Sequence, residues 1–221
     1  MENLKKKQSL RKSKDLLRLI NEAINLDETL IKINGNQKDI FFSYIQTSIQ
    51  KSFALESKIP LWLKNLDGLS GKKFRYFINN LIDIMPDPKY LEIGSWLGST
   101  ACSASYGNTL SITCIDNWSE FFNQDKKPST AFKKNIKKCI SKKSNFSIIE
   151  KNFRDVDYSK INKFNLFFFD GPHHMKDHYD AIKLVQPCLE DKFILIIDDW
   201  NWKQVRKGTL NAIIDLKLHI E

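Results

Sequence analysis

The stretch Tyr90-Leu-Glu-Ile-Gly-Ser-Trp-Leu-Gly-Ser99 decides the fold that we predict for this chain. Its first four residues favour a β-strand, and prolines shortly before it close off the preceding segment. Gly94 and Gly98 then allow the backbone to turn tightly and to approach another molecule without a Cβ in the way. The small residues from Ser99 to Ser105 suit a helix packed closely against a sheet. A strand, a glycine loop and a helix open the nucleotide-binding α/β folds, although a tight turn without a ligand would use the same glycine pair.

Carboxylates follow each of the further core strands that the sequence predicts. These strands cover residues 110–115, 165–169 and 193–197, beside an apolar run over 146–149. Asp116, Asp170 and the pair Asp198-Asp199 stand at their ends. In an open parallel sheet the ligand crevice lies outside the carboxyl ends of the strands, so we expect these acids and Glu92 to surround one crevice. Any single aspartate could instead serve as a turn residue.

The position of Asp116 supports a nucleotide-like ligand. It follows Gly94 by 22 positions, close to the ~20 residues after which a Rossmann-type unit places an acid on a ribose hydroxyl. The expected fold class is therefore α/β, with a Rossmann-like, doubly wound and mostly parallel sheet.

Three motifs carry a resemblance to a known family. EIGSWLGS, at residues 92–99, resembles the E-x-G-x-x-x-G loop of class I S-adenosylmethionine (SAM) dependent methyltransferases, and it differs from the G-x-G-x-x-G loop of NAD and FAD enzymes. FFFDGPHH (167–174) and IIDDW (196–200) further resemble the small-molecule O-methyltransferases, including the macrocin and catechol O-methyltransferase-like enzymes. The similarity covers about residues 68–214. It implies a seven-stranded sheet with helices on both faces, and methyl transfer from SAM.

The resemblance implies a SAM site around the glycine loop. Glu92 is expected near the methionine end of SAM, and Asp116 is expected to accept hydrogen bonds from the ribose hydroxyls. Trp118 or Phe153 is expected to stack on the adenine, although core packing would also explain either ring. The expected cofactor contacts are Glu92, Gly94, Gly98, Ser99, Asp116, Asn117, Trp118, Asn152, Phe153 and Asp170.

Three acids have the spacing of a metal site in metal-dependent enzymes of this branch. Asp198 and Asp199 follow Asp170 by 28 and 29 positions. The resemblance therefore implies a Mg²⁺ ion on these three residues, and Mg²⁺ prefers oxygen ligands. A cation on the substrate hydroxyl would lower the pKa of that hydroxyl. Alternatively, Asp198 and Asp199 only cap the segment that follows.

His173 and Asp170 are the expected catalytic residues. His173 lies three residues after Asp170, where the catechol enzyme-like pattern has a basic residue that acts on the substrate hydroxyl. Imidazole is a suitable proton acceptor near neutral pH, but an ordinary surface histidine explains His173 equally well. His174 and His178 are spaced i, i+4, and we expect them to share one face of the following helix.

Length and composition predict one α/β domain with a helical extension. Residues 1–70 are expected to form a helical N-terminal extension or lid, and residues 71–221 the SAM-binding domain. Apolar residues recur at helical spacing from Leu16 to Ile24, again over 40–53, and once more over 70–84, where Ser70 could cap a helix. No apolar run approaches the ~20 residues of a membrane span. Four cysteines without paired spacing indicate reduced core thiols and a cytoplasmic protein.

The net charge of +9 supports a rival interpretation. The segment Lys126–Lys143 contains eight lysines and no acid, and Phe132, Ile136 and Ile140 predict an amphipathic helix with the lysines outside. Such a face could bind nucleic acid. We favour a simply solvated face, because the chain has neither a dedicated reader segment nor an N-P-P-Y-like target-base motif.

The C-terminal end departs from the family pattern. Residues 216–220 predict a sixth strand, after which no sequence remains for the usual seventh. A truncated product, a strand supplied by a second copy in a homo-oligomer, or a shorter sheet would each explain this. We expect a SAM-dependent methyltransferase that acts on a hydroxyl of a small molecule or sugar with help from Mg²⁺. The alternatives are a nucleic-acid or N-methyltransferase of the same fold, or a non-catalytic binding protein.

Overall fold

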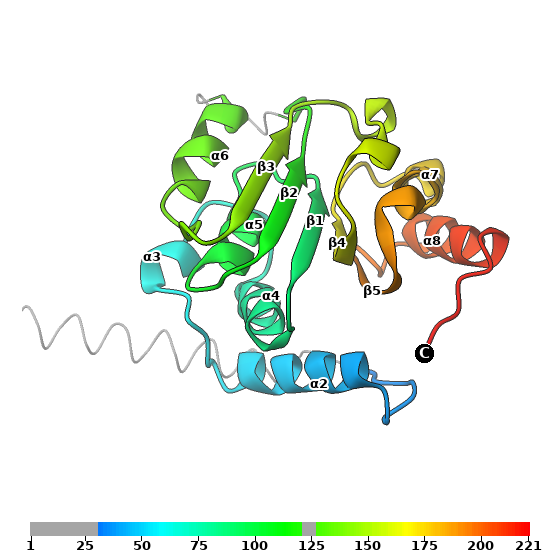
Figure 1. Cartoon of the computed structure of the whole chain (residues 1–221), viewed down its shortest axis with the longest axis horizontal. Helices are drawn as coiled ribbons and strands as arrows, with labels where there is room; N and C mark the ends of the chain where they lie inside the picture. Colours follow the sequence, from blue (N-terminus) through cyan, green and yellow to red (C-terminus); the bar gives the residue numbers. More distant parts are fainter. Residues whose placement is uncertain (1–30, 121–126) are drawn as a thin grey trace, which may run out of the picture. The chain divides into compact units, whose positions relative to one another are not determined.

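Five strands form one parallel sheet in the order β3-β2-β1-β4-β5 (Figure 1). They are β1 (Lys89–Ile93), β2 (Ser111–Ile115), β3 (Asn145–Ile149), β4 (Phe164–Phe169) and β5 (Leu189–Ile197). This computed structural model describes residues 31–120 and 127–221. The predicted Rossmann-like α/β fold is confirmed, with five strands among the described residues in place of the family's seven.

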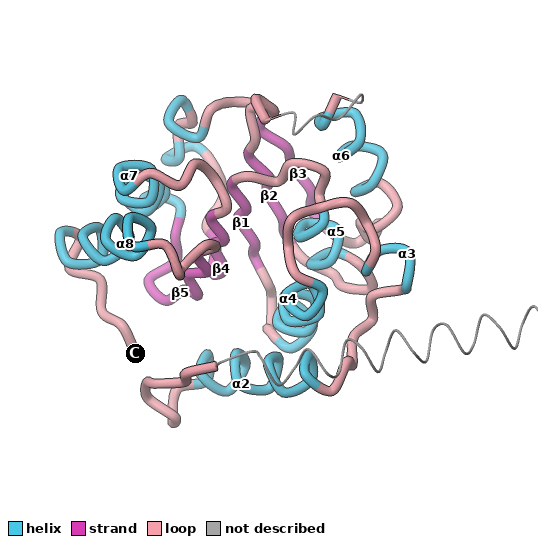
Figure 2. The backbone as a smooth tube through the Cα atoms, turned by 180° about the vertical axis from the view of Figure 1, so that it is seen from behind, coloured by secondary structure: helices cyan, strands magenta, loops and turns pink. Residues whose placement is uncertain are grey.

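The described helices are α2 (Ile40–Phe53), α3 (Leu61–Lys64), α4 (Lys72–Ile84), α5 (Ser99–Ser105), α6 (Pro128–Ile136), α7 (Met175–Val185) and α8 (Lys203–Asp215). Parallel strands need crossover connections, and α5, α6 and α7 lie in the connections after β1, β2 and β4. Three short 3₁₀ turns are η1 (Phe153–Asp155), η2 (Tyr158–Lys160) and η3 (Gln186–Cys188). Seen from behind, α3, α4 and α5 lie together on one side of the sheet, and α7 and α8 lie beside β4 and β5 (Figure 2).

Two apolar clusters cover the two faces of the sheet. In β4, Leu166 and Phe168 belong to the cluster that includes α4 and α5, whereas Phe167 and Phe169 belong to the cluster that includes α7 and α8. Successive side chains of a strand point to opposite faces, so an uninterrupted apolar strand must be buried on both. All six residues of β4 are buried. The sequence FNLFFF thus specifies a central strand rather than an edge strand.

The strand order reverses at β1. The chain runs from β1 outward to β2 and β3, and then returns to place β4 on the other side of β1. Open α/β sheets bind ligands at the carboxyl ends of the strands where the order reverses. The segments after β1, β2 and β4 are therefore the expected walls of a crevice.

The N-terminal part of the described structure is helical, as predicted for 40–53 and 70–84. Residues 37–221 form one compact unit, in which Phe41, Tyr44 and Ile45 of α2 pack against the α4 side of the core. Helix α4 begins at Lys72, and Ser70 does not cap it, because the Ser70 hydroxyl bonds the Arg75 and Ser99 side chains instead. The helix predicted from Leu16 to Ile24 lies outside the described residues. A division at residue 70, and a lid role for the first part, stay predictions.

The predicted sixth strand over 216–220 is wrong. Helix α8 ends in a turn at Lys217, whose φ is +53°, and Leu218 donates its N–H to the Ile213 carbonyl at 2.9 Å. This pattern is a Schellman-type helix end, which turns the backbone N–H groups back onto the helix. The Leu216 and Leu218 side chains pack against the α7–α8 cluster. The alternating apolar residues of 216–220 thus belong to the end of a helix that folds onto the core, and they do not form a strand.

The lysine-rich segment forms the predicted amphipathic helix, α6. Phe132 and Ile136 are buried, and the lysines from 127 to 143 are exposed, while Lys126 lies outside the described residues. The four cysteines are buried and unpaired, as expected for core thiols. Within residues 31–120 and 127–221, no helix has the length and apolar character needed to cross a membrane.

Candidate active site

The strand-end residues stand in one row, because the backbone hydrogen bonds of the sheet continue past the strands. Gly94 donates its N–H to the Ile115 carbonyl at 3.0 Å. Asp170 donates in the same way to Ile93 at 2.9 Å, and Asp198 to Phe169 at 3.1 Å. The structure thus brings the ends of β1, β4 and β5 to one level, with Asp116 after β2 beside them. The sequence predicted that these residues would stand together at one edge of the sheet, and a ligand crevice lined by them stays a prediction.

The glycine loop approaches β4 more closely than a side chain would allow. Gly94 has φ +91°, and a Cβ added there would lie 1.9 Å from the Asp170 carbonyl oxygen. Gly98 has φ +86°, and its Cβ would lie 2.9 Å from the Phe132 ring. A left-handed φ and a close contact both require glycine. The loop between β1 and α5 therefore packs closely against β4, at the point where the strand order reverses.

Asp116 holds the glycine loop with one carboxylate oxygen and its own turn after β2 with the other. Its Oδ2 accepts the Trp96 N–H at 2.8 Å, and its Oδ1 accepts the Trp118 N–H at 2.6 Å. Burial raises the pKa of Asp116, although the two backbone hydrogen bonds oppose that shift. Each carboxylate oxygen can accept a further hydrogen bond. Asp116 can therefore position the loop and still accept from a ligand hydroxyl.

Glu92 is a fully buried acid directly before the loop, with 0 % of its surface exposed. Tyr90 Oη donates to Glu92 Oε2 at 2.5 Å, whereas Oε1 has no hydrogen-bond partner. Burial raises the pKa of Glu92 to about 7, although the hydrogen bond from Tyr90 lowers it. A buried, half-satisfied carboxylate is costly unless a donor or a positive charge completes it. The ammonium group of SAM has that chemistry, so the residues here fit the cofactor.

The aromatic residues expected at the adenine are built into the core. Trp118 is 8 % exposed, and its ring lies 5.3 Å from that of Phe132. Phe153 is 5 % exposed, with the Arg154 guanidinium 4.4 Å from its ring centre. The contacts show core packing for both rings. The Trp118 indole Nε1 is buried and has no hydrogen-bond partner.

The other expected cofactor residues occupy the rim. Asn117 and Asn152 are exposed, and each uses its side-chain oxygen to accept a backbone N–H two residues further on. Ser99 is buried at the start of α5, where its hydroxyl lies 2.9 Å from that of Ser70. These roles are local turn and loop contacts. A cofactor contact for each stays a prediction.

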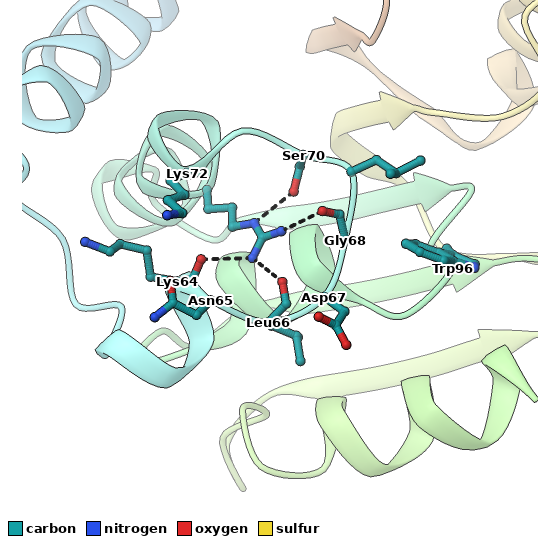
Figure 3. A pocket seen from close by; sticks show the side chains of 10 residues that line it. Lys64, Asn65, Leu66, Asp67, Gly68, Ser70, Lys72 and Trp96 are labelled. Carbon is teal, nitrogen blue, oxygen red and sulfur yellow. Dashed lines mark hydrogen bonds between the residues drawn. The ribbon is translucent and has the colours of Figure 1, made fainter. Parts of the chain in front are cut away.

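An open pocket of about 390 Å³ lies beside the glycine loop (Figure 3). It is lined by residues 64–70, Lys72, Arg75 and Trp96. The buried Arg75 guanidinium shapes it by donating to the carbonyls of Leu63, Lys64, Leu66 and Gly68, at 2.7 to 3.3 Å. Arg75 Nε also donates to the Ser70 hydroxyl at 3.0 Å. One arginine thus fixes the loop that faces Trp96.

The three carboxylates predicted to hold Mg²⁺ contact different partners. Asp170 lies within hydrogen-bonding reach of Asp198, and burial together with the Asp198 charge raises the pKa of Asp170 well above its usual range. Asp199 turns instead toward His173. Among the residues that the structure describes, no three His, Cys, Asp or Glu side chains are grouped as a metal would require. As they are partnered here, the three carboxylates are not grouped around one point, and a Mg²⁺ ion on them stays a prediction.

His173 and Asp199 form a pair at the carboxyl edge of β4 and β5. His173 Nε2 lies 2.8 Å from Asp199 Oδ2, although the direction of the ring N–H falls short of hydrogen-bond geometry. Both side chains are roughly one-third exposed, at 37 % and 36 %. A carboxylate beside an imidazole orients the ring and stabilises its protonated form. An imidazole beside a carboxylate is the arrangement that a general base requires.

The prediction that His174 and His178 share a helix face is wrong. His174 is the N-cap of α7, in extended backbone and exposed, where it forms a capping box with Asp177. His178 is 1 % exposed, and its ring lies 4.8 Å from that of Phe169 in an edge-on contact. Burial lowers the pKa of His178 to about 4. The helix begins one residue after His174, so the i, i+4 rule does not apply.

The sequence did not indicate several residues that shape the site. Arg75 binds the 63–70 loop without a local sequence signal, and Tyr90 bonds Glu92 from two residues away, on the same face of β1. Arg206 of α8 donates Nη1 to the carbonyls of Trp200 and Asn201, both at 2.8 Å. The exposed Trp200 and Trp202 beside the IIDDW motif were the one sequence signal for this turn.

Comparison with known proteins agrees with this geometry. Residues 91–200 match a family model described as a methyltransferase domain. No curated protein sequence matches the chain. The solved structure of precorrin 8W decarboxylase from Methanobacterium thermoautotrophicum is similar, with 11 % identity, a TM-score of 0.53, and coverage of 71 % of this chain and 77 % of that one. At that identity the likeness shows the fold alone.

Two further solved structures are similar over more of the chain but at lower TM-scores. The O-methyltransferase TomG from Streptomyces achromogenes is 10 % identical, with a TM-score of 0.48 and coverage of 90 % and 85 %. A putative O-methyltransferase from Klebsiella pneumoniae is 10 % identical, with a TM-score of 0.45 and coverage of 85 % and 80 %.

The five-stranded sheet and the glycine loop at its switch point are those of the class I, SAM-dependent methyltransferase fold. The matched methyltransferase domain spans Leu91 to Trp200, and it contains Glu92, Gly94, Asp116 and the acids of the crevice. This chain is a SAM-dependent methyltransferase.

Proposed function

We propose that this enzyme transfers the methyl group of SAM to a hydroxyl of a small molecule or sugar. The observation that carries the proposal is the His173–Asp199 pair, 2.8 Å apart at the same sheet edge as the glycine loop. An oxygen nucleophile needs a proton acceptor, and this pair is partly exposed beside the crevice. The macrocin and catechol-like resemblance of FFFDGPHH and IIDDW supports the same acceptor class.

The cofactor would lie across the ends of β1 and β2. The open Oε1 of Glu92 would accept from the ammonium group of the methionine part, and the free acceptor capacity of Asp116 would take the ribose hydroxyls. The loop from Gly94 to Ser99 would pass along the cofactor, with Asn117, Trp118, Asn152 and Phe153 toward the adenine. When bound, SAM supplies an electrophilic methyl carbon on a sulfonium, which leaves as a neutral thioether.

The protein's part in the chemistry is orientation and proton acceptance. With His173 Nε2 lying 2.8 Å from Asp199 Oδ2, the other ring nitrogen, Nδ1, would take the hydroxyl proton of the acceptor. The freed oxygen lone pair forms the new O–C bond as the C–S bond breaks and its electron pair stays on sulfur. Asp199 stabilises the imidazolium that results. Holding both partners in line contributes by proximity. Asp170 would help to shape the acceptor end of the crevice.

Mg²⁺ assistance stays a separate proposal, and no step is assigned to it. Asp170 and Asp198 are near enough to share one cation, and oxygen ligands suit Mg²⁺. Asp199 would have to exchange its contact with His173 for the ion. Exhaustive chelation with EDTA, followed by addition of Mg²⁺, tests this directly. A rate of methyl transfer that is unchanged by both treatments would rule out a role for Mg²⁺ in the reaction.

A nucleic-acid acceptor is the second candidate. Seven lysines between Lys127 and Lys143 are exposed on and after α6, and Glu150 is paired with Lys133 at 2.6 Å. A basic face of this kind binds phosphate backbones in a salt-dependent way. Retention of RNA that falls steeply with salt, together with methyl transfer to that RNA, would favour this candidate over the small-molecule one.

The first experiment is calorimetric titration with S-adenosylhomocysteine. Wild-type protein is expected to bind at micromolar affinity, and Asp116→Ala is expected to lose that binding because its contact with the glycine loop and its acceptor for the ribose hydroxyls both disappear. Asp191→Ala, on an exposed acid near the amino end of β5, is the matched control. Absence of binding by folded wild-type protein would overturn the proposal.

A further inference from the structure

Trp202 places a large, partly exposed indole ring against His173 of the His173–Asp199 pair. Its ring centre lies 5.0 Å from that of His173, at an interplanar angle of 52°. It is 47 % exposed, although it is the largest kind of apolar side chain. A single exposed aromatic residue needs no explanation by itself. One in ring contact with the proposed proton acceptor does, because an acceptor molecule must pass beside it.

The turn that carries Trp202 is held in place. Asp199 has φ +49°, and Trp202 donates its N–H to the Asp199 carbonyl at 2.8 Å. Arg206, one helical turn further on, binds the carbonyls of Trp200 and Asn201 with one nitrogen. The backbone from 199 to 202 is therefore fixed from both ends before any ligand arrives. A fixed ring loses little conformational freedom when a ligand stacks on it.

The carboxylates at this sheet edge accept hydrogen bonds. Asp199 is beside His173, and Asp198 precedes it next to Asp170. Carboxylates accept from hydroxyl groups and repel an anionic ligand. Arg206 directs its Nη1 to the carbonyls of Trp200 and Asn201 within this turn, and not toward a ligand on the Trp202 ring. The chemistry favours a neutral molecule with several hydroxyls.

We propose that Trp202 is the stacking platform for a neutral sugar ring, and that this ring carries the methylated hydroxyl. A pyranose has an apolar C–H face for the indole and hydroxyls around its edge for Asp198 and Asp199. A phenol would stack equally well, but its one or two hydroxyls would leave most of these acceptors unused. The proposal rests on the proposed function and narrows its substrate class.

Arg206 is the positioning residue of this platform. It touches neither acceptor nor cofactor in this arrangement, because its bonds go to the backbone of Trp200 and Asn201. If those bonds break, the turn is free to move, and both the indole and the Asp199 carboxylate lose their fixed places. Arg206 would therefore act on acceptor affinity and leave SAM binding unchanged.

The test begins with S-adenosylhomocysteine binding, which reports the proposed function alone. Protein that binds it is then given tritiated SAM with a panel of neutral methyl glycosides and a matched panel of phenols. Transfer to at least one glycoside is expected, with a KM that rises about tenfold in Trp202→Ala, as loss of an aromatic stacking contact predicts. Trp202→Phe is expected to recover most of the affinity. Trp62→Ala removes an exposed indole of α3 and is the control.

The outcomes of this test distinguish failure of the proposed function from failure of the sugar-platform proposal. No binding of S-adenosylhomocysteine overturns the proposed function itself. Binding without transfer to any glycoside, transfer to phenols only, or a glycoside KM that is equal in wild type and Trp202→Ala overturns the sugar platform and leaves the proposed function standing. A raised glycoside KM in Arg206→Met, with unchanged affinity for S-adenosylhomocysteine, supports the positioning role. Lys207→Met, on the exposed neighbour, is its control.

Discussion

Gly94 lies against the carbonyl of Asp170, so closely that a Cβ on Gly94 would stand 1.9 Å from that oxygen. The contact joins the end of β1 to the end of β4 at the point where the strand order reverses. It brings the glycine loop and the acid after β4 into one crevice. The spacing of the proposed cofactor and acceptor sites depends on this approach.

Gly94→Ala is therefore expected to unfold or to lose more than about 2 kcal/mol of stability, because strain at φ +91° adds to the collision with backbone. Thermal unfolding with and without S-adenosylhomocysteine measures the loss. Gly71→Ala is the matched control, since a Cβ there meets nothing within 4 Å. Equal melting temperatures for the two variants would contradict the close approach.

The His173–Asp199 pair predicts a rate effect without a binding effect. His173→Gln is expected to lower turnover about 10²–10⁴-fold, the usual contribution of a general base. Asp199→Asn is expected to lower it less, since the imidazole itself remains. Affinity for S-adenosylhomocysteine, measured by calorimetry, should change less than about twofold. His219→Gln, on an exposed histidine, should retain the wild-type rate, and an unchanged rate in His173→Gln would remove it from the mechanism.

Glu92 predicts a pH-dependent stability. Burial raises its pKa from 4.5 to about 7 in the folded protein, so its contribution is fully present below pH 4.5 and is lost as the pH rises through 7. The loss amounts to about 3 kcal/mol. Glu92→Gln removes this titration while keeping an acceptor for Tyr90. Relative to the variant, wild type should lose stability between about pH 5 and pH 8 in urea unfolding. A pH-independent difference between the two proteins would refute the raised pKa.

Arg75 predicts a structural effect on the pocket. Arg75→Met removes a buried fork of donors to four carbonyls and one hydroxyl, and is expected to cost at least about 2 kcal/mol. Arg75→Lys should rescue only part of this, because one ammonium cannot reproduce the planar fork. Hydrogen exchange of residues 63–70 should rise in both variants. Unchanged exchange in Arg75→Met would contradict the clamp.

Much of the fold followed from local patterns. The glycine loop, the strands and the helices α2 and α4 were predictable because alternation, helical spacing and turn residues act within a few positions. The row of acids was predictable because parallel strands end at one edge. The strand predicted over 216–220 failed, because a two-residue alternation also occurs where a helix end folds its leucines onto a core.

The sequence by itself determined which residues reach the carboxyl edge of the sheet: Gly94, Asp116, Asp170 and the pair Asp198-Asp199. Only the tertiary structure decided how they are partnered there. Asp199 turns to His173, and Asp170 pairs with Asp198. The physical reason is that a carboxylate's partner depends on distances of a few ångströms between elements far apart in the chain. Local patterns constrain the backbone path, and packing of the whole unit sets those distances.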